Sequence, residues 1–424
     1  MSAVDGATVG ARALTLAGAD QILRPPQSGL PWLRGADVAA QTLDGGDLGL
    51  ADGLIAEAPL RGAPRLDVTG CALVPGFVDC HTHLPFAGWR AGEYAQKLAG
   101  VTYAEIARGG GGIRASARAL AQSSDERVLE QAAGLAAEML ATGTTTFEGK
   151  SGYGLERDQE LRALGLATAL GAFVPQTTLS TALLAHAVPD GFDTAAWMRE
   201  VEAMMPEVIE LGTVSALDIF VEAIAFSTDD LRVMGELARA AGMMLRVHGE
   251  QFQRLGTVPV ALQAQARSID HLSVADDEDV ALLADAPCAA VLLPAAEFLG
   301  AEHRAPGRAL ADAGALVVLA SDLNPGTAPV SSMPAIIGLA ARLYGLSPRE
   351  TLAATTLNAA WVLGLERTLG SLEAGKRADV LVLDGPVEEI AYRFARNPVA
   401  VVLCGGVPVW TRPDWSGRVA EAMA

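Results

Sequence analysis

The chain has 424 residues, of which 50% are hydrophobic, and a formal net charge of −19. This length predicts more than one domain unless a large α/β barrel is present, and the apolar content suffices for a sizeable core. The acidic balance argues against a nucleic-acid partner, because neutralising phosphates requires clustered lysines and arginines.

Two further features bear on where the protein works. No apolar run reaches the length of a membrane span, and residues 1–12 lack the basic and apolar segments of a secretory signal. The four cysteines form no C-x-x-C pair and are typical of reduced, mostly buried thiols. We therefore expect a cytoplasmic protein without a membrane partner.

The two ends of the chain share a β-rich pattern that the middle lacks. Short β-type segments, separated by Gly, Pro and Asp turns, lie at 12–16, 38–40 and 48–57, and again at 380–383, 399–404 and 407–410. Gly405-Gly406 joins the last two segments and is a hairpin signal. We expect a small β-sandwich domain built from both termini, with residues 1–69 as its N-terminal part and 368–424 as its C-terminal part.

Residues 70–367 alternate between apolar β-type runs and helical segments, which indicates a parallel α/β sheet. The runs lie at 71–78, 144–148, 172–178, 216–222, 243–248, 268–272, 289–293 and 315–320. Helical segments include 91–107, 125–142, 229–241 and 330–344. Alternating units of this number predict a (β/α)8, TIM-like barrel, whose active site lies at the C-terminal ends of its strands.

Two histidines follow the first of these runs. His81 and His83 are separated by one residue, and side chains alternate along a strand, so both imidazoles can point the same way. A metal ion needs such a pair on a rigid support. A lone His-x-His is equally compatible with ordinary hydrogen bonding, so other ligands must come from elsewhere in the chain.

Polar groups also follow three other expected strands. His248 ends one run, His271 ends the next, and Asp322 follows the last, so four of the six histidines of the chain lie at strand ends. Each group alone could be a cap or a hydrogen-bonded core residue, but their joint placement favours a site. His81, His83, His248 and Asp322 could bind a metal through three nitrogens and one oxygen, which leaves a position for water. His271 could then polarise a carbonyl or move a proton.

With these residues, the chain resembles the amidohydrolase superfamily and, within it, the imidazolonepropionase family. The resemblance runs from about residue 70 to the C-terminus. The motifs that carry it are His81-Thr82-His83-Leu84, Arg90, the segments 97–106 and 110–113, Lys150-Ser151-Gly152-Tyr153-Gly154-Leu155, Leu184-Ala185-His186-Ala187-Val188-Pro189, Asp270-His271-Leu272 and Ser321-Asp322-Leu323-Asn324-Pro325-Gly326. The resemblance implies a metal-binding barrel flanked by a β-sandwich, one zinc or iron ion per subunit, and a homodimer.

The resemblance also implies roles for residues that would bind a small-molecule substrate. Arg90 would bind a propionate carboxylate, and its guanidinium suits that group. The other implied substrate-binding residues are Tyr153, His186, Gln251, Asn324, Gly326 and Thr327. Gln251 can orient a ring but cannot carry a proton, so any acid at that place must be Glu250, Asp322 or His271. From the residues alone, Arg90 could be a surface arginine, His186 a satisfied loop histidine and Asn324 a turn residue.

The reaction implied is the hydrolysis of 4-imidazolone-5-propanoate to N-formimidoyl-L-glutamate in histidine degradation, with Asp322 and His271 as catalytic residues. The alternatives are another cyclic amide or amidine hydrolase, a nucleobase deaminase, and a metal-binding scaffold without activity. Lys150 follows the second strand and is not expected to bridge two metals. Glycines 109–112 predict a mobile loop over the site, while Trp89 and His303 have no expected role.

Overall fold

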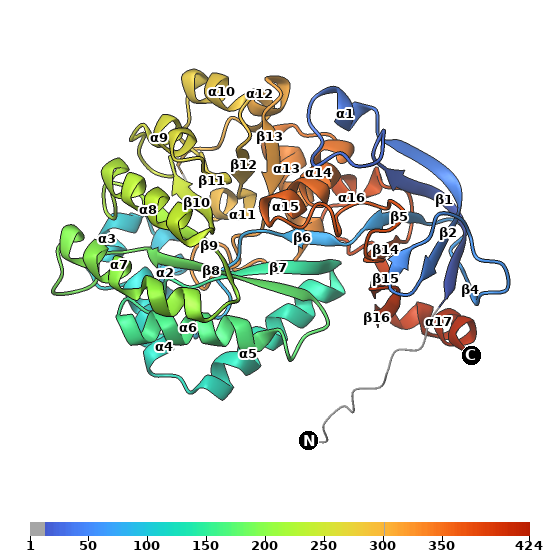
Figure 1. The fold of residues 1–424 in the computed structure, drawn as a ribbon, viewed down its shortest axis with the longest axis horizontal. Coiled ribbons are helices and arrows are strands. Elements are labelled where there is room, and N and C mark those ends of the chain that lie inside the picture. The colour runs from blue at the N-terminus through green and yellow to red at the C-terminus, as the bar shows by residue number, and fades with distance from the viewer. Residues whose placement is uncertain (1–12, 301) are drawn as a thin grey trace.

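The computed structural model describes residues 13–300 and 302–424, which form a barrel and a separate β-sheet (Figure 1). The barrel has eight parallel strands in the sequential order β6 to β13. They are β6 (Phe77–Asp79), β7 (Thr144–Lys150), β8 (Thr177–Ala185), β9 (Val214–Val221), β10 (Met244–Gly249), β11 (Ser268–His271), β12 (Ala289–Leu292) and β13 (Leu316–Leu319). The predicted (β/α)8 architecture is confirmed.

The ring closes just beyond the C-terminal ends of its first and last strands. The backbone N–H of Asp322 donates to the carbonyl of His81 at 3.0 Å, and the N–H of His83 donates to the carbonyl of Leu323 at 2.9 Å. Closure therefore takes place at three of the predicted metal ligands. Their backbones are held by the barrel and not by free loops.

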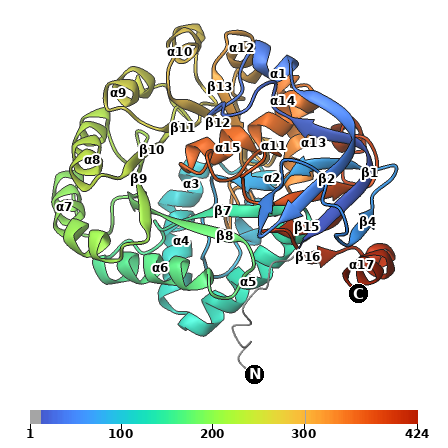
Figure 2. The same cartoon turned by 45° about the vertical axis from the view of Figure 1, so that its right-hand side comes forward.

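Helices accompany the barrel strands, and many of them lie on the outer side of the ring (Figure 2). They are α2 (Ala91–Leu98), α3 (Tyr103–Arg108), α4 (Ile113–Ala121), α5 (Asp125–Ala141), α6 (Arg157–Leu170), α7 (Thr194–Glu210), α8 (Thr228–Ala241), α9 (Thr257–Gln263), α10 (Asp277–Leu283), α11 (Pro294–Phe298), α12 (Gly307–Asp312), α13 (Met333–Tyr344), α14 (Pro348–Ala354) and α15 (Leu357–Val362). Local sequence sets many of their ends. In α8, for example, Ser227 and Asp230 form a capping box, and Gly242 ends the helix in the left-handed region.

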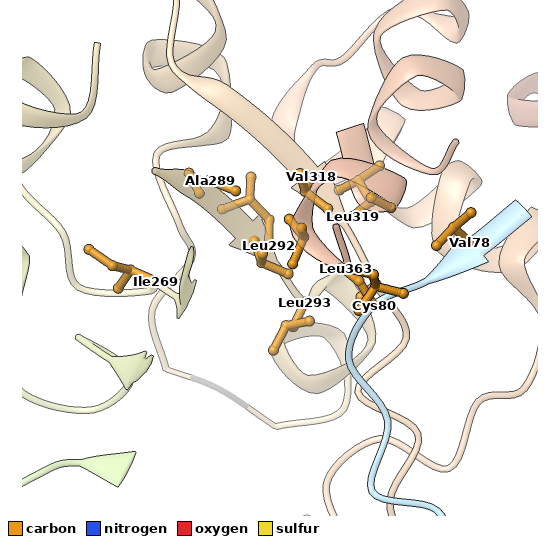
Figure 3. Packing of buried hydrophobic residues seen from close by; sticks show 14 of the residues in the cluster. Val78, Cys80, Ile269, Ala289, Leu292, Leu293, Val318, Leu319 and Leu363 are labelled. Atoms are coloured by element: carbon orange, nitrogen blue, oxygen red, sulfur yellow. The ribbon is translucent and has the colours of Figure 1, made fainter. Parts of the chain in front are cut away.

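Apolar strand side chains fill the space between the ring and the helices. Around β12 and β13, buried Leu292 and Val318 pack in one cluster with Val78 of β6 and with Leu363, which follows α15 (Figure 3). Burying large aliphatic side chains in this way supplies the main favourable free energy of folding. The strands are therefore held firmly, and so are the polar groups that follow them.

The second sheet is built from both ends of the chain. Its strands are β1 (Leu14–Arg24), β2 (Thr42–Ala51), β3 (Leu54–Ile55), β4 (Arg65–Asp67), β5 (Ala72–Pro75), β14 (Val380–Leu383), β15 (Val399–Cys404) and β16 (Val407–Thr411). Short helices α1 (Ala36–Ala39), α16 (Glu389–Tyr392) and α17 (Ser416–Met423) and a 3-10 turn (Pro413–Trp415) accompany them. The sheet encloses its own apolar cluster, which includes Leu16 and Val401, so the predicted β-rich unit of both termini is confirmed.

The expected strand 71–78 is in fact two strands. It divides at Gly76, with β5 in the terminal sheet and β6 in the barrel, so one extended segment links the two units (Figure 1). A Cβ at Gly76 would lie 2.1 Å from Oγ1 of Thr145 in β7, so glycine permits the close passage. We propose domains at 1–69, 70–367 and 368–424, with β5 as the part of the middle segment that pairs in the terminal sheet.

Three other sequence expectations were wrong. The segment 38–40 is not β-type, because α1 packs Val38 against Ala353 and Leu357. The helix expected at 91–107 breaks into α2 and α3 at Gly100, which has a φ of 90°, and Thr102 starts the second helix by exchanging hydrogen bonds with Glu105. The third barrel strand is β8 and not 172–178, so it ends directly before His186.

Two further sequence predictions concern secretion and insertion into a membrane. Residues 1–12, in which we expect no secretory signal, lie outside the described residues. Within 13–300 and 302–424, none of the helices is both long and apolar enough to span a bilayer. All four cysteines are buried and unpaired.

Candidate active site

Five histidines and one aspartate meet at the C-terminal mouth of the barrel. All six side chains are buried, and they are His81, His83, His186, His248, His271 and Asp322. The ring centroids of His81 and His248 are 4.4 Å apart, and those of His83 and His186 are 5.2 Å apart in a stacked arrangement. Parallel strands of a barrel direct their C-terminal ends to one place, which explains why residues so distant in sequence converge.

Their ligand atoms form two overlapping groups that could hold a metal ion. His81, His83 and Asp322 form one group, and His81, His248 and His271 form the other, with all atoms of a group within 4.8 Å of one another. Oδ1 of Asp322 lies 3.5 Å from Nε2 of His81 and 3.3 Å from Nε2 of His83. The other three predicted ligands thus lie around His81, and His271 is also within reach.

Two of these histidines are oriented by carboxylates behind them. Nδ1 of His81 is 2.5 Å from Oδ2 of Asp270, and Nδ1 of His248 is 3.0 Å from Oδ1 of Asp218. The opposite nitrogens, Nε2 of His81 and of His248, are buried and have no hydrogen-bond partner among the described residues. An imidazole held through Nδ1 with Nε2 directed into a shared space is the usual arrangement of a metal-binding histidine.

The electrostatics of the site also suit a cation. Burial lowers the pKa of His81 and His83 far below the ordinary histidine value, and burial lowers the pKa of His271 to about 3. These imidazoles are therefore neutral, which is the form that binds metals. Burial raises the pKa of Asp322, because the ionised form of a carboxylate is disfavoured out of water unless a positive charge lies nearby. The residues present fit a bound divalent metal.

A network of buried charges lies beneath the histidines. Nζ of Lys150 lies 2.8 Å from Oε2 of Glu148 and 2.7 Å from Oδ2 of Asp218. The guanidinium of Arg246 lies 2.9 Å from Oε1 of Glu148 and 2.8 Å from Oδ2 of Asp270. Burial alone would raise the pKa of Asp218, but His248 and Lys150 hold it well below its usual range. Lys150 thus helps to keep Asp218 ionised, whereas burial raises the pKa of Asp270 and Arg246 opposes that rise.

The sequence reasoning missed the roles of Asp218, Arg246 and Asp270. Each of these charged residues lies inside an apolar barrel strand. This pattern could have indicated buried ion pairs, since a buried charge must be paired. The ammonium of Lys150 is engaged by two carboxylates, in keeping with the expectation that it does not bridge metals.

The strand ends carry unusual backbone conformations. Glu250, His271, Leu272 and Asp322 have φ values of 53°, 82°, 59° and 54°. Residues other than glycine rarely adopt positive φ, and each such residue costs of order 1–3 kcal/mol. Strain of this kind persists where the surrounding structure fixes a side-chain direction, and here it directs His271 and Asp322 into the mouth.

A cavity opens above the histidines. It is lined by His83, Arg90, Ile113, Tyr153, His186, Phe220, His248, Gln251, Phe252, His271, Asp322, Asn324 and Thr327. The predicted substrate-binding residues Arg90, Tyr153, His186, Gln251, Asn324 and Thr327 therefore share one cavity with the metal group. Gly326 lies outside that lining and directly against the guanidinium of Arg90.

Arg90 is held at the edge of this cavity. Its Nη1 donates to the carbonyl of Gly112 at 3.0 Å and to Oγ of Ser116 at 2.6 Å, and its Nε lies 3.1 Å from Oε2 of Glu93. A Cβ at Gly326 would lie 1.8 Å from Nη2 of Arg90, so Gly326 makes room for the guanidinium. The glycine segment 109–112 thus contacts the site through Gly112, and its predicted mobility stays a prediction.

Asn324 mainly organises its own turn. Its amide nitrogen donates to the carbonyl of Asp322 at 2.7 Å and to Oγ1 of Thr327 at 2.8 Å, and its Oδ1 accepts the N–H groups of Gly326 and Thr327. The turn chemistry considered from sequence is therefore present. A direct contact of Asn324 with substrate stays a prediction.

Glu250 and Gln251 point to different places. Both carboxylate oxygens of Glu250 accept backbone N–H groups, from Leu255 at 2.9 Å and Thr257 at 2.6 Å, whereas Gln251 lines the cavity. Glu222, at the end of β9, accepts the N–H of Phe252 at 3.0 Å and so holds the Gln251 segment. Of the three acids considered from the sequence, Asp322 and His271 belong to the groups that could hold a metal, whereas Glu250 binds backbone N–H groups.

Two residues without an expected role lie away from the metal group. Trp89 is 49% exposed and packs edge-on against Phe86 with a centroid distance of 5.1 Å. His303 is exposed and lines a neighbouring cavity, which shares Gln251 and Phe252 with the active-site cavity. Neither belongs to the groups that could bind a metal.

Comparisons with known proteins agree with this geometry. The model of the amidohydrolase family matches residues 72–409. Imidazolonepropionase from Rubrobacter xylanophilus is 44% identical over 352 residues, which cover 82% of this chain and 84% of that protein. The chain belongs to the imidazolonepropionase family of amidohydrolases. The enzyme of that name from a Geobacillus species is 36% identical over 388 residues, which cover 90% of this chain and 89% of the relative.

Solved structures of other amidohydrolases share the fold. A triazine hydrolase variant superimposes with a TM-score of 0.73 at 18% identity, covering 97% of this chain and 99% of that one. An adenosine deaminase from Xanthomonas campestris with bound zinc gives a TM-score of 0.66 at 18% identity, covering 97% of each chain. At this identity the likeness concerns the fold alone. As a member of the imidazolonepropionase family, the protein is a metal-dependent hydrolase of a cyclic amide C–N bond.

Proposed function

We propose that this hydrolase opens the ring of 4-imidazolone-5-propanoate to give N-formimidoyl-L-glutamate. The observation that carries the proposal is one cavity that is lined both by members of the histidine and aspartate metal group and by Arg90, whose guanidinium is anchored. The combination of a metal group and an anchored guanidinium suits a substrate that carries both a hydrolysable ring and a carboxylate. The family relatives named imidazolonepropionase support the same substrate.

We propose His81, His83, His248 and Asp322 as the ligands of one zinc or iron ion. Three neutral nitrogens and one carboxylate oxygen suit either ion, and the set leaves room for a water molecule. When bound, the ion supplies Lewis acidity that lowers the pKa of that water toward neutrality.

The residues around the ion would move the protons. Asp322, close to both imidazoles of the His-x-His pair, takes the proton of the attacking water. His271, buried beside His248 with ring centroids 5.5 Å apart, hydrogen-bonds the ring carbonyl oxygen as negative charge develops there. The ring C–N bond then breaks, and the ring nitrogen that leaves takes up the proton that Asp322 accepted from the water, so the linear product forms and Asp322 is ionised again.

The far end of the cavity would recognise the substrate. Arg90 binds the propionate carboxylate, and Gly326 and the turn of Asn324 and Thr327 shape the space around it. Tyr153 and His186 contact the ring and the carboxylate, and Gln251 orients the ring. A nucleobase has no carboxylate for the Arg90 guanidinium to bind in addition to that of Glu93, so this arrangement favours a carboxylated substrate over the deaminase alternative.

The test is the ultraviolet loss of freshly generated 4-imidazolone-5-propanoate, with and without a chelator. We expect turnover that the chelator abolishes and that added zinc or iron restores. Absence of turnover by metal-replete protein would refute the proposed substrate and direct the search to other carboxylated cyclic amides. Metal analysis of the purified protein tests the one-ion stoichiometry. From the family resemblance we also propose a homodimer, which light scattering tests. We further propose a cytoplasmic location.

A further inference from the structure

A short loop carries Tyr153 to the cavity. This Tyr153 loop, residues 151–155, connects β7 to α6. Its backbone is unusual, because Gly152 has a φ of 104° and Leu155, which is not glycine, has a φ of 52°. A loop in these conformations is strained unless its surroundings hold it.

Glu160 is the group that holds this loop. It lies in α6, is 1% exposed, and accepts a hydrogen bond from the N–H of Gly152 at 2.8 Å through Oε2. Its Oε1 accepts the N–H groups of Gly154 at 2.7 Å and Leu155 at 2.9 Å. Burial raises the pKa of this carboxyl, and the N–H donors of the loop oppose that rise. One buried side chain thus satisfies three backbone donors that would otherwise lack partners.

The loop also sits directly on the helix and on His186. A Cβ at Gly154 would lie 2.3 Å from the backbone nitrogen of Glu160, so the loop packs against the first turns of α6. The carbonyl of Gly152 is 2.9 Å from Nδ1 of His186. Glu160 is therefore connected through one residue, Gly152, to the imidazole of His186, and through the loop backbone to Tyr153.

We propose that Glu160 is a positioning residue for substrate recognition. It fixes the Tyr153 loop so that Tyr153 and His186 present a single preformed surface to the substrate, although Glu160 itself touches neither the substrate nor the metal group. The inference rests on the proposed function, in which Tyr153 and His186 contact the substrate. Preformed geometry of this kind lowers the cost of ordering side chains on binding.

The experiment compares Glu160→Gln with Glu156→Gln, an exposed residue just before α6 whose side chain makes no capping bond. The amide nitrogen of the introduced glutamine cannot accept a backbone N–H, so KM should rise about tenfold, while kcat and metal content stay within about twofold. The control should leave all three unchanged. An unaltered KM in Glu160→Gln would overturn the inference.

A double-mutant cycle separates positioning from general destabilisation. If Glu160 acts through His186, the effect of Glu160→Gln on KM should fall to about threefold or less in a His186→Ala background. Full additivity of the two effects would show that Glu160 does not act through His186, which would overturn the inference of a single surface formed with Tyr153.

Hydrogen exchange tests the anchor without any activity. In the wild-type protein, the amides of Gly152, Gly154 and Leu155 should exchange as slowly as those of β7, and Glu160→Gln should accelerate them at least about tenfold. Fast exchange in the wild type would overturn the inference even if the variant does not fold. Lack of turnover by wild-type protein would instead refute the proposed substrate and leave this measurement valid.

Discussion

Two parts of the active-site cavity are held in different ways: the metal end, with its histidines and Asp322, and the recognition end, with Arg90, Tyr153 and Gln251. At the metal end, histidines at strand ends are oriented from below by a buried network in which Lys150 and Arg246 pair with three carboxylates. At the recognition end, Arg90, Tyr153 and Gln251 lie on segments held by single side chains that bind backbone groups, such as Glu160 and Glu222. The barrel strands support the metal end, whereas local anchors support the recognition end.

This difference implies that substitutions at the two ends should have separate effects. Changes in the buried network remove partners from charges that have no access to water, so they should affect stability, metal retention and kcat together. Changes at the recognition end should act mainly on KM, since they affect a part of the substrate remote from the bond that breaks.

The largest effect is expected at Asp322. Asp322→Ala should abolish measurable turnover and weaken metal retention, because Asp322 is proposed both as a metal ligand and as the base. Single-turnover assays and metal analysis after dialysis measure the two consequences. Asp312→Ala, which changes an aspartate whose side chain is 68% exposed, is the matched control and should behave as wild type. Residual activity near the wild-type level would contradict the metal assignment.

Arg246 should show the next largest effect, and it should act through stability. Arg246→Met leaves Glu148 and Asp270 without their guanidinium partner, and such a loss costs about 3–5 kcal/mol of unfolding free energy. Denaturant unfolding measures that loss, and metal analysis should show weaker retention because Asp270 orients His81. Arg232→Met removes an exposed ion pair instead and should cost no more than about 1 kcal/mol. Equal stability of the two variants would show that the buried network has no special role.

Arg90 should separate binding from chemistry. Arg90→Ala should raise KM about tenfold or more and leave kcat within about threefold, because we propose that the guanidinium binds the carboxylate and not the reacting carbonyl. Steady-state kinetics with metal-saturated enzyme give both constants. Arg127→Ala, on the exposed face of α5, is the control and should change neither constant. A kcat loss with an unchanged KM would place the carboxylate elsewhere.

The smallest effect is expected at His303. It is exposed and belongs to the neighbouring cavity, so His303→Ala should change kcat and KM by no more than about twofold. Steady-state kinetics and metal content at the same metal loading measure this. A loss of metal in this variant would mean that the first coordination shell extends beyond the barrel mouth.

The sequence by itself determined the barrel and the candidate metal ligands. Alternating apolar runs specify parallel strands, and the C-terminal ends of such strands meet, so His81, His83, His248 and Asp322 could be placed together without coordinates. It placed some boundaries wrongly. The strand before His186 was misplaced, and one apolar run proved to cross from one sheet to the other at Gly76.

Only the tertiary structure decided which residues hold the site in place. His81 and Asp270 are separated by 189 positions in the chain, and Arg246 and Glu148 by 98, so their pairing depends on strand neighbours and inward directions. The sequence likewise does not distinguish Glu160 from other helical glutamates, because its hydrogen bonds depend on the packing of α6 against the Tyr153 loop. Local patterns encode where polar groups stand along a strand or helix. Their partners are set by packing between distant segments, which no short sequence pattern contains.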